Sequence, residues 1–159
     1  MPSDATTDLL ALMSPRKGHF RFESGHHGET WLEIPRLFLR PASLRPFVKQ
    51  LARRLSPHRV EAVCGPAVEG ALLAQMVAEE LELAFFFAEK VTNPHGRATG
   101  PAACQIPESL RDAARGKNFA VVDDVINAGS AVQAVLDDFS ACGARPVAIG
   151  ALMVLGQSA

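Results

Sequence analysis

The sequence predicts an α/β fold built on a parallel sheet. Beyond Pro57, short apolar runs recur between segments of helical periodicity. Continuous apolar runs are typical of strands buried on both faces, and their alternation with helices is typical of parallel sheets with right-handed crossovers. A chain of 159 residues can form one domain with its own core. Its 48% hydrophobic and 21% charged residues are ordinary values for a globular protein.

The first third of the chain is expected to form two small strands between two helices. Apolar residues near the N-terminus predict a short helix that ends before Pro15. Residues 20–23 and 30–34 then predict two strands, which a polar turn containing glycines joins. From Ser43 onward, apolar residues recur at helical spacing with basic residues on the other face. This pattern predicts an amphipathic helix capped by Ser43.

The rest of the chain is expected to supply the parallel sheet. The strand candidates are residues 60–64, 84–88, 119–122 and 147–155. The helix candidates are residues 70–81 and 130–141. Residues 89–116 hold three prolines and three glycines, which predicts a mobile loop with room for one short helix. Ligands of such sheets bind beyond the carboxyl ends of the strands, which directs attention to the loops after Cys64, Ala88 and Val122.

Composition excludes several classes of partner. The formal net charge of −1 provides no basic field for nucleic acid or an anionic membrane surface. Cys64, Cys104 and Cys142 are odd in number and about forty residues apart, which fits neither a disulfide framework nor a zinc site. We expect reduced thiols in the cytoplasm. No leader pattern and no apolar run long enough for a membrane helix is visible.

The strongest chemical signal is the segment FAVVDDVINAGSA at residues 119–131. An apolar strand is predicted to end in Asp123 and Asp124, and a loop of small residues then enters a helix near Ser130. Backbone N–H groups at the start of a helix form a cradle for an anion. Carboxylates next to such a cradle would repel the phosphate itself, so we expect them to accept hydrogen bonds from sugar hydroxyls. A ribose phosphate would supply a phosphate for the cradle and hydroxyl groups for the carboxylates.

Other interpretations of this segment are weaker. The glycine patterns of a dinucleotide-binding loop and of a P-loop are absent. A receiver domain also has paired aspartates after an apolar strand, but there the strand opens the fold, and only 35 residues follow Asp124 here. An ordinary helix N-cap remains open as an alternative.

A second segment, VCGPAVEGA at residues 63–71, passes from a strand into a helix through a tight turn. Gly65 and Gly70 allow close approach of the backbone to a ligand, and we expect the amides of residues 67–70 to face an anion. By itself the segment is an ordinary turn. Because the segment lies about sixty residues before the acidic motif, we expect it to form a second part of the same site.

The acidic motif resembles the signature of the type I phosphoribosyltransferase family. Residues 18–25, residues 30–33 and Pro41 resemble the N-terminal pattern of orotate phosphoribosyltransferases within that family, and the resemblance covers nearly the whole chain. It implies a type I phosphoribosyltransferase fold with a small N-terminal hood. We therefore expect a single domain over residues 1–159, with the hood at about 1–42 and the core at about 43–159.

The resemblance also implies a role for each motif. Asp123 and Asp124 would contact the ribose hydroxyls, and Lys90 and His95 would join them as catalytic residues. The 5-phosphate of phosphoribosyl pyrophosphate (PRPP) would be bound by Asn127, Ala128, Gly129, Ser130 and Ala131. The pyrophosphate would be bound by Gly65, Pro66, Ala67, Val68, Glu69 and Gly70. The base pocket would contain Phe20, Phe22, Glu23 and Gln133.

The implied reaction transfers ribose 5-phosphate from PRPP to a nucleobase with release of pyrophosphate. Mg²⁺ is the implied cofactor, with no direct protein ligand identified, and a homodimer is the implied assembly. Four positions depart from the pattern of orotate enzymes, because cations are replaced at Glu23, Glu89, Asn93 and Gln133. Charge-assisted bonds are the strong ones, so a base other than orotate is expected. The alternative is a non-catalytic module that binds PRPP or a nucleotide.

Overall fold

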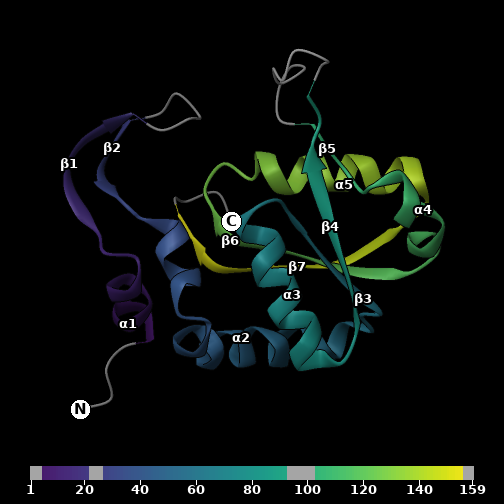
Figure 1. Cartoon of the computed structure of the whole chain (residues 1–159), viewed down its shortest axis with the longest axis horizontal. Helices are drawn as coiled ribbons and strands as arrows, with labels where there is room; N and C mark the ends of the chain where they lie inside the picture. Colours follow the sequence, from purple (N-terminus) through teal and green to yellow (C-terminus); the bar gives the residue numbers. More distant parts are fainter. Residues whose placement is uncertain (1–4, 22–26, 93–102, 156–159) are drawn as a thin grey trace. The chain divides into compact units, whose positions relative to one another are not determined.

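A computed structural model of the chain describes residues 5–21, 27–92 and 103–155. They belong to two compact units, Met1–Phe47 and Val48–Ala159 (Figure 1). The expected division, a hood at about 1–42 and a core at about 43–159 within one domain, stays a prediction.

The first unit contains a short helix and a two-stranded hairpin. Helix α1 spans Ala5–Leu12, and strands β1 (Arg16–Arg21) and β2 (His27–Trp31) pair in antiparallel fashion. The N-terminal helix is confirmed, but both strands begin earlier than the apolar pattern predicted. Cross-strand pairing extends them toward Arg16 and His27, where the side chains are exposed and the sequence carries no hydrophobic signal.

The two units share one long helix. A 3₁₀ helix, η1 (Ile34–Leu39), leads into helix α2, which spans Pro41–Leu55. The expected cap at Ser43 is wrong, because α2 begins two residues earlier and Ser43 lies in its first turn. Proline favours the first turn of a helix, where its missing N–H has no intrahelical acceptor, and Pro41 accounts for the earlier start.

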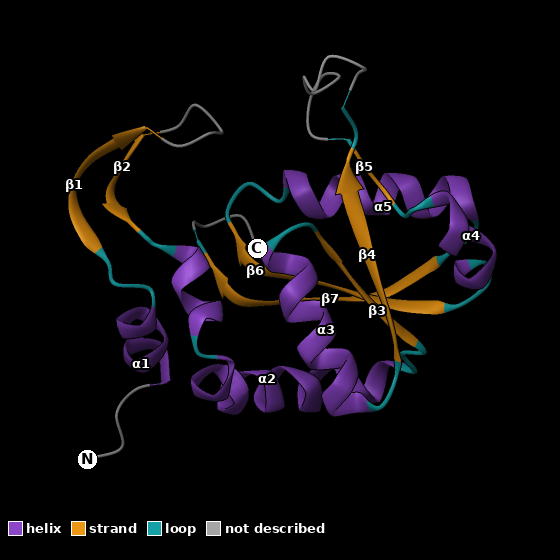
Figure 2. Cartoon of the chain, viewed as in Figure 1, coloured by secondary structure: helices purple, strands orange, loops and turns teal. Residues whose placement is uncertain are grey.

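The second unit is a five-stranded sheet with helices on both sides (Figure 2). Its elements in chain order are η2 (Ser56–His58), β3 (Ala62–Pro66), α3 (Glu69–Leu81), β4 (Ala84–Lys90), β5 (Cys104–Gln105), α4 (Glu108–Ala114), β6 (Asn118–Ile126), α5 (Ser130–Cys142) and β7 (Arg145–Val154). The strand order is β5-β4-β3-β6-β7. All neighbouring pairs are parallel except β4 with β5. The predicted α/β fold with a mainly parallel sheet is confirmed.

Two segments differ from expectation. Strand β6 does not end before the acids, because β7 continues beside it and pairs Asp123 with Ala151 and Ile126 with Val154. The segment expected to be one mobile loop contains the end of β4, strand β5 and helix α4, of which only the short helix was foreseen. Residues 93–102 of that segment lie outside the described part of the chain.

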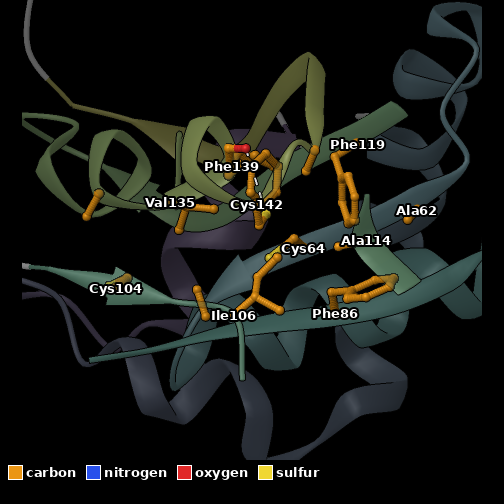
Figure 3. Close-up of a cluster of buried hydrophobic side chains, with 14 of the residues drawn as sticks. Ala62, Cys64, Phe86, Cys104, Ile106, Ala114, Phe119, Val135, Phe139 and Cys142 are labelled. Atoms are coloured by element: carbon orange, nitrogen blue, oxygen red, sulfur yellow. Dashed lines mark hydrogen bonds between the residues drawn. The ribbon is translucent and has the colours of Figure 1, made fainter. Parts of the chain in front are cut away.

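One hydrophobic cluster of the second unit lies between the sheet and α5 (Figure 3). The Phe119 ring packs against Phe139 with ring centroids 4.7 Å apart, and against Phe86 at 5.0 Å. The three cysteines are buried free thiols. Burial raises the pKa of the Cys64 thiol, and the charge of Asp138 acts in the same direction. This thiol therefore stays protonated and unreactive. Within the described residues, no helix is long and apolar enough to cross a membrane.

Candidate functional site

The predicted site segments converge at one edge of the sheet. Strands β3, β4 and β6 are parallel neighbours, so their carboxyl ends share an edge. The turn after β3 reaches the acids of β6 directly. A Cβ atom added to Gly70 would lie 2.7 Å from Asp123 Oδ1 and 2.8 Å from Pro66 Cδ. Two segments more than fifty residues apart in the sequence therefore lie in contact, as the combined motif predicted.

The turn between β3 and α3, residues 67–70, is called the β3 turn, and it requires glycine at position 65 near the end of β3. A Cβ atom on Gly65 would lie 2.1 Å from the carbonyl oxygen of Gly70, a distance that no side chain tolerates. The peptide bond between Ala67 and Val68 is cis. Val68 is 64% exposed, so the middle of the turn faces outward. The turn is thus a close-packed scaffold with an open outer surface.

One expectation for this turn is wrong in detail. The Ala67 N–H donates to the carbonyl oxygen of Ala88 at 2.8 Å, so this amide faces β4 rather than a ligand. Helix α3 has no side-chain cap, and its first intrahelical bond runs from Leu72 N to Val68 O. The amides of Glu69 and Gly70 in the first helical turn remain to bind an anion.

Asp123 and Asp124 form a buried acid pair, with 8% and 9% of their surfaces exposed. The Asp124 N–H donates to Asp123 Oδ1 at 3.0 Å. Burial raises the pKa of Asp123 to about 8, and the hydrogen bond with Asp124 and the charge of Asp124 act in the same direction. Burial likewise raises the pKa of Asp124, and the charge of Glu69 adds to the shift at both residues. Near neutral pH the free pair therefore keeps one proton.

The acid pair makes folding stability depend on pH. Between pH about 4 and about 8, folded Asp123 keeps a proton that the unfolded chain has lost, because its pKa rises from 3.8 to about 8. The unfolded state then binds fewer protons, so the free energy of unfolding is expected to fall as pH rises through this window. Asp123→Asn removes this contribution. The free energy of unfolding should then fall less steeply with pH, and some fall remains because the pKa of Asp124 is also raised.

Urea unfolding at pH 5, 6, 7 and 8 tests this expectation, with Asp112→Asn as the control. Asp112 is a fully exposed acid on α4, and its replacement should leave the wild-type slope unchanged. A wild-type slope in Asp123→Asn would contradict a raised pKa at Asp123.

The loop after β6 leads straight into a helix start. Gly129 adopts φ 76° as the N-cap of α5, a conformation that favours glycine, and Ser130 is the first helical residue. No side chain caps this helix, and its first intrahelical bond runs from Gln133 N to Gly129 O. The amides of Ser130 and Ala131 are therefore without intrahelical acceptors. With exposed Ala128 beside them, they offer donors to an anion.

A cavity of about 750 Å³ adjoins this loop. It is lined by Ala128, Gly129 and Ser130, by Gln133 further along α5, and by residues of β7 that include Ile149 and Val154. The Gln133 Nε2 donates to Asp137 Oδ1 at 2.8 Å. Gln133 thus shares a cavity with the predicted phosphate loop. The β7 residues in the lining were not anticipated, because only strand pairing places them there.

Lys90 is the last residue of β4, two residues beyond Ala88, which pairs with Pro66 at the end of β3. Glu89 and Lys90 are exposed and line a separate cavity of about 240 Å³ together with Gln105 and Glu108. Lys90 therefore lies near the edge of the sheet that carries the β3 turn, but it lines a different cavity from Gln133.

Four positions named from the sequence lie outside the described residues. They are Phe22, Glu23, Asn93 and His95. Phe20 is described in β1, where its ring lies 5.8 Å from that of Trp31 between centroids. Because Phe20 belongs to the first unit, its role in a base pocket stays a prediction.

The acids of the site suit Mg²⁺ chemically, because this ion prefers oxygen ligands and keeps several waters. The negative charge of Glu69 acts on both Asp123 and Asp124, so three carboxyl groups share one neighbourhood. Within residues 5–21, 27–92 and 103–155, no group of three His, Cys, Asp or Glu side chains is placed to hold an ion by itself.

Comparisons with known proteins point to one family. Residues 45–158 match the phosphoribosyl transferase domain. An orotate phosphoribosyltransferase of Caldanaerobacter subterraneus is 28% identical over 137 residues, which are 86% of this chain and 67% of that protein. Among solved structures, an orotate phosphoribosyltransferase from Aeropyrum pernix has a TM-score of 0.71 at 18% identity, covering 95% of this chain and 93% of that one.

A second solved structure has nearly the same similarity. An adenine phosphoribosyl transferase from Trypanosoma brucei, in complex with AMP, pyrophosphate and ribose-5-phosphate, has a TM-score of 0.72 at 18% identity. The match covers 97% of this chain and 69% of that one. At this identity both structures establish the fold alone, and the fold is common to enzymes named for different bases.

Proposed function

The chain belongs to the phosphoribosyl transferase domain family, and from this premise we propose that it transfers ribose 5-phosphate from PRPP to a nucleobase with release of pyrophosphate. One observation carries the proposal above all. Asp123 Oδ1 lies against Gly70, which brings the β3 turn and the acid pair together in the carboxyl-terminal half of β6. The relative reported above is named for a transferase, which favours an enzyme over a non-catalytic binding module.

Each part of the site has a distinct task in this proposal. The amides at the start of α5 bind the 5-phosphate, and the amides of Glu69 and Gly70 bind the pyrophosphate end. Between them, Asp123 and Asp124 accept hydrogen bonds from the ribose hydroxyls. The free pair keeps one proton near neutral pH, and the charge of its ionised carboxylate stabilises positive charge that develops on the sugar as the bond to pyrophosphate breaks. Catalysis then depends on positioning and electrostatics, with no covalent nucleophile.

Magnesium is proposed as the cofactor, bound mainly to PRPP with Glu69, Asp123 and Asp124 nearby. When bound, it neutralises charge on the pyrophosphate. Lys90 and His95 are proposed to assist the same leaving group. Phe20, Phe22, Glu23 and Gln133 are proposed for the base pocket. We also propose a homodimer in the cytoplasm, a compartment that suits three free cysteines.

The preferred base is proposed to lack a carboxylate. Gln133 has one neutral amide where an arginine is expected in orotate enzymes, and that amide already donates to Asp137. An anionic base next to Gln133 would be repelled by the charge of Asp137, and Gln133 would offer no positive charge to offset this repulsion. We therefore expect pyrophosphate release to be faster with uncharged bases than with orotate.

A panel of bases tests the proposal. The purified chain is incubated with PRPP, Mg²⁺ and one base at a time, with orotate, uracil, adenine, hypoxanthine and guanine in turn. Pyrophosphate release is measured by a coupled assay, and binding of ribose 5-phosphate by calorimetry. Release with at least one base supports the enzyme. Binding without release from any base would favour the binding module, and absence of both would overturn the proposed site.

A further inference from the structure

Asp138 is a buried carboxylate on α5 that holds the segment after β5. Its side chain is 5% exposed. One oxygen accepts a hydrogen bond from the Ile106 N–H at 2.8 Å, and the other accepts one from Arg111 Nη1 at 2.8 Å. Neither partner is near Asp138 in sequence, so the contact ties α5 to the β5–α4 connection.

We propose that Asp138 is a positioning residue, which fixes Lys90 relative to the phosphate-binding start of α5. The inference rests on the proposed function, because it assigns Asp138 a role in the same reaction. It goes beyond that function by naming a residue that lies away from the ligand-binding loops and acts through a strand pair.

The route from Asp138 to Lys90 is short. Ile106 directly follows β5, whose residues Cys104 and Gln105 pair with Lys90 and Glu89 of β4. The Val91 N–H also donates to the carbonyl oxygen of Ala103 at 2.9 Å. Fixing Ile106 therefore fixes the register of β5, and the pairing passes this constraint to the end of β4.

The other end of the connection is helix α5 itself. Asp138 lies eight residues after Ser130 on the same helix, which corresponds to about 12 Å along the axis. A helix of this length moves as one body, so Asp138 keeps a fixed relation to the amides at its start. Lys90 and the 5-phosphate loop belong to opposite ends of the proposed PRPP site. The Asp138 carboxylate holds both of them in position.

Burial makes the contact of Asp138 with Ile106 and Arg111 rigid. Ile106 is 1% exposed, so its N–H needs a protein acceptor. Arg111 balances the buried charge of Asp138, and the hydrogen bond that Arg111 donates to Asp138 raises the pKa of Arg111. Burial raises the pKa of the Cys104 thiol, the charge of Lys90 lowers it, and the charges of Asp123 and Asp138 raise it, so Lys90 and Asp138 both act electrostatically on this residue of β5.

A double-mutant cycle separates positioning from a purely structural role. The variants are Asp138→Asn, Lys90→Ala and the two combined, with exposed Asp112→Asn as the matched control. Asp138→Asn keeps the shape of the side chain but loses its charge. We expect kcat to fall about tenfold while the KM for PRPP stays within about twofold, because misplaced catalytic groups affect the chemical step most. Binding of ribose 5-phosphate should stay unchanged in affinity and stoichiometry.

The decisive result is the effect of Asp138→Asn in the Lys90→Ala background. If Asp138 acts through Lys90, the second substitution adds less than about twofold. A full tenfold loss in both backgrounds, or no loss caused by Lys90→Ala itself, would overturn the positioning role.

Hydrogen exchange keeps the inference testable if the proposed function fails. Should the wild-type chain release no pyrophosphate, Asp138→Asn must still speed amide exchange at Ile106 and at Val91, and Asp112→Asn must not. Faster exchange at Ile106 alone would show that the constraint does not reach β4, and this would refute the inference independently of catalysis.

Discussion

Replacing Asp124 with asparagine is expected to lower kcat for pyrophosphate release by about 10²–10³-fold, the usual effect of removing one preorganised electrostatic group. Asp124 is 9% exposed, so its charge acts on the sugar with little screening by water. Asparagine keeps one hydrogen-bond acceptor but loses the negative charge. The loss should therefore appear in kcat, measured with saturating PRPP and the best base of the panel.

The fold of Asp124→Asn should remain intact. Burial raises the pKa of both residues, and the charge of Asp124 raises that of Asp123 further, so Asp124→Asn removes an unfavourable buried charge. We expect a Tm equal to or above that of the wild type. Asp112→Asn, at an exposed site, controls for loss of an acid elsewhere. Full activity in Asp124→Asn would remove this carboxylate from the mechanism.

Replacing Gly65 with alanine is expected to destabilise the protein by about 3 kcal/mol, at the upper end of overpacking effects. The new Cβ atom would lie 2.1 Å from Gly70 O and 2.4 Å from Gly70 C. These are backbone atoms, which cannot move aside as a flexible side chain does. The β3 turn must shift, and with it the Gly70 backbone that contacts Asp123. Urea unfolding measures the stability, and calorimetry with pyrophosphate measures the binding, which should weaken.

Gly116→Ala is the matched control for this substitution. Gly116 has φ 74° and no atom within 4 Å of the added Cβ, so alanine there costs only the left-handed conformation, about 1 kcal/mol. Pyrophosphate binding should be unchanged in that variant. Equal losses of stability at both glycines, with binding retained, would show that the β3 turn tolerates a side chain.

Local sequence patterns were sufficient to predict those helices and strands whose hydrophobic or turn pattern lies within a single segment. Apolar runs located β3, β4, β6 and β7 to within a few residues, except that β6 and β4 continue further than their apolar parts. Helix α5 begins at Ser130 as predicted, because Gly129 and the small loop residues allow few other starts. The starts of α2, β1 and β2 were misjudged, since Pro41 and cross-strand pairing are stronger than the hydrophobic pattern there.

Properties that depend on two distant segments could not be read from the sequence. The pattern placed Asp123 and Asp124 after a strand, but β7 extends that strand through them. Their burial, and the pKa of about 8 at Asp123, follow from this packing. The bond from the Ala67 amide to Ala88 and the anchoring of Ile106 by Asp138 depend on strand and helix positions that no local periodicity encodes.

The amino-acid sequence by itself determined the family, the fold class and the two segments that meet in the proposed site, because glycine, acid and small-residue positions are local requirements of turns and helix starts. Only the tertiary structure decided which amides remain open to a ligand, how deeply the acids are buried and which strand pairs with Lys90. Those properties come from neighbours across the sheet, and hydrogen bonding and desolvation act between atoms that are close in space whatever their distance along the chain.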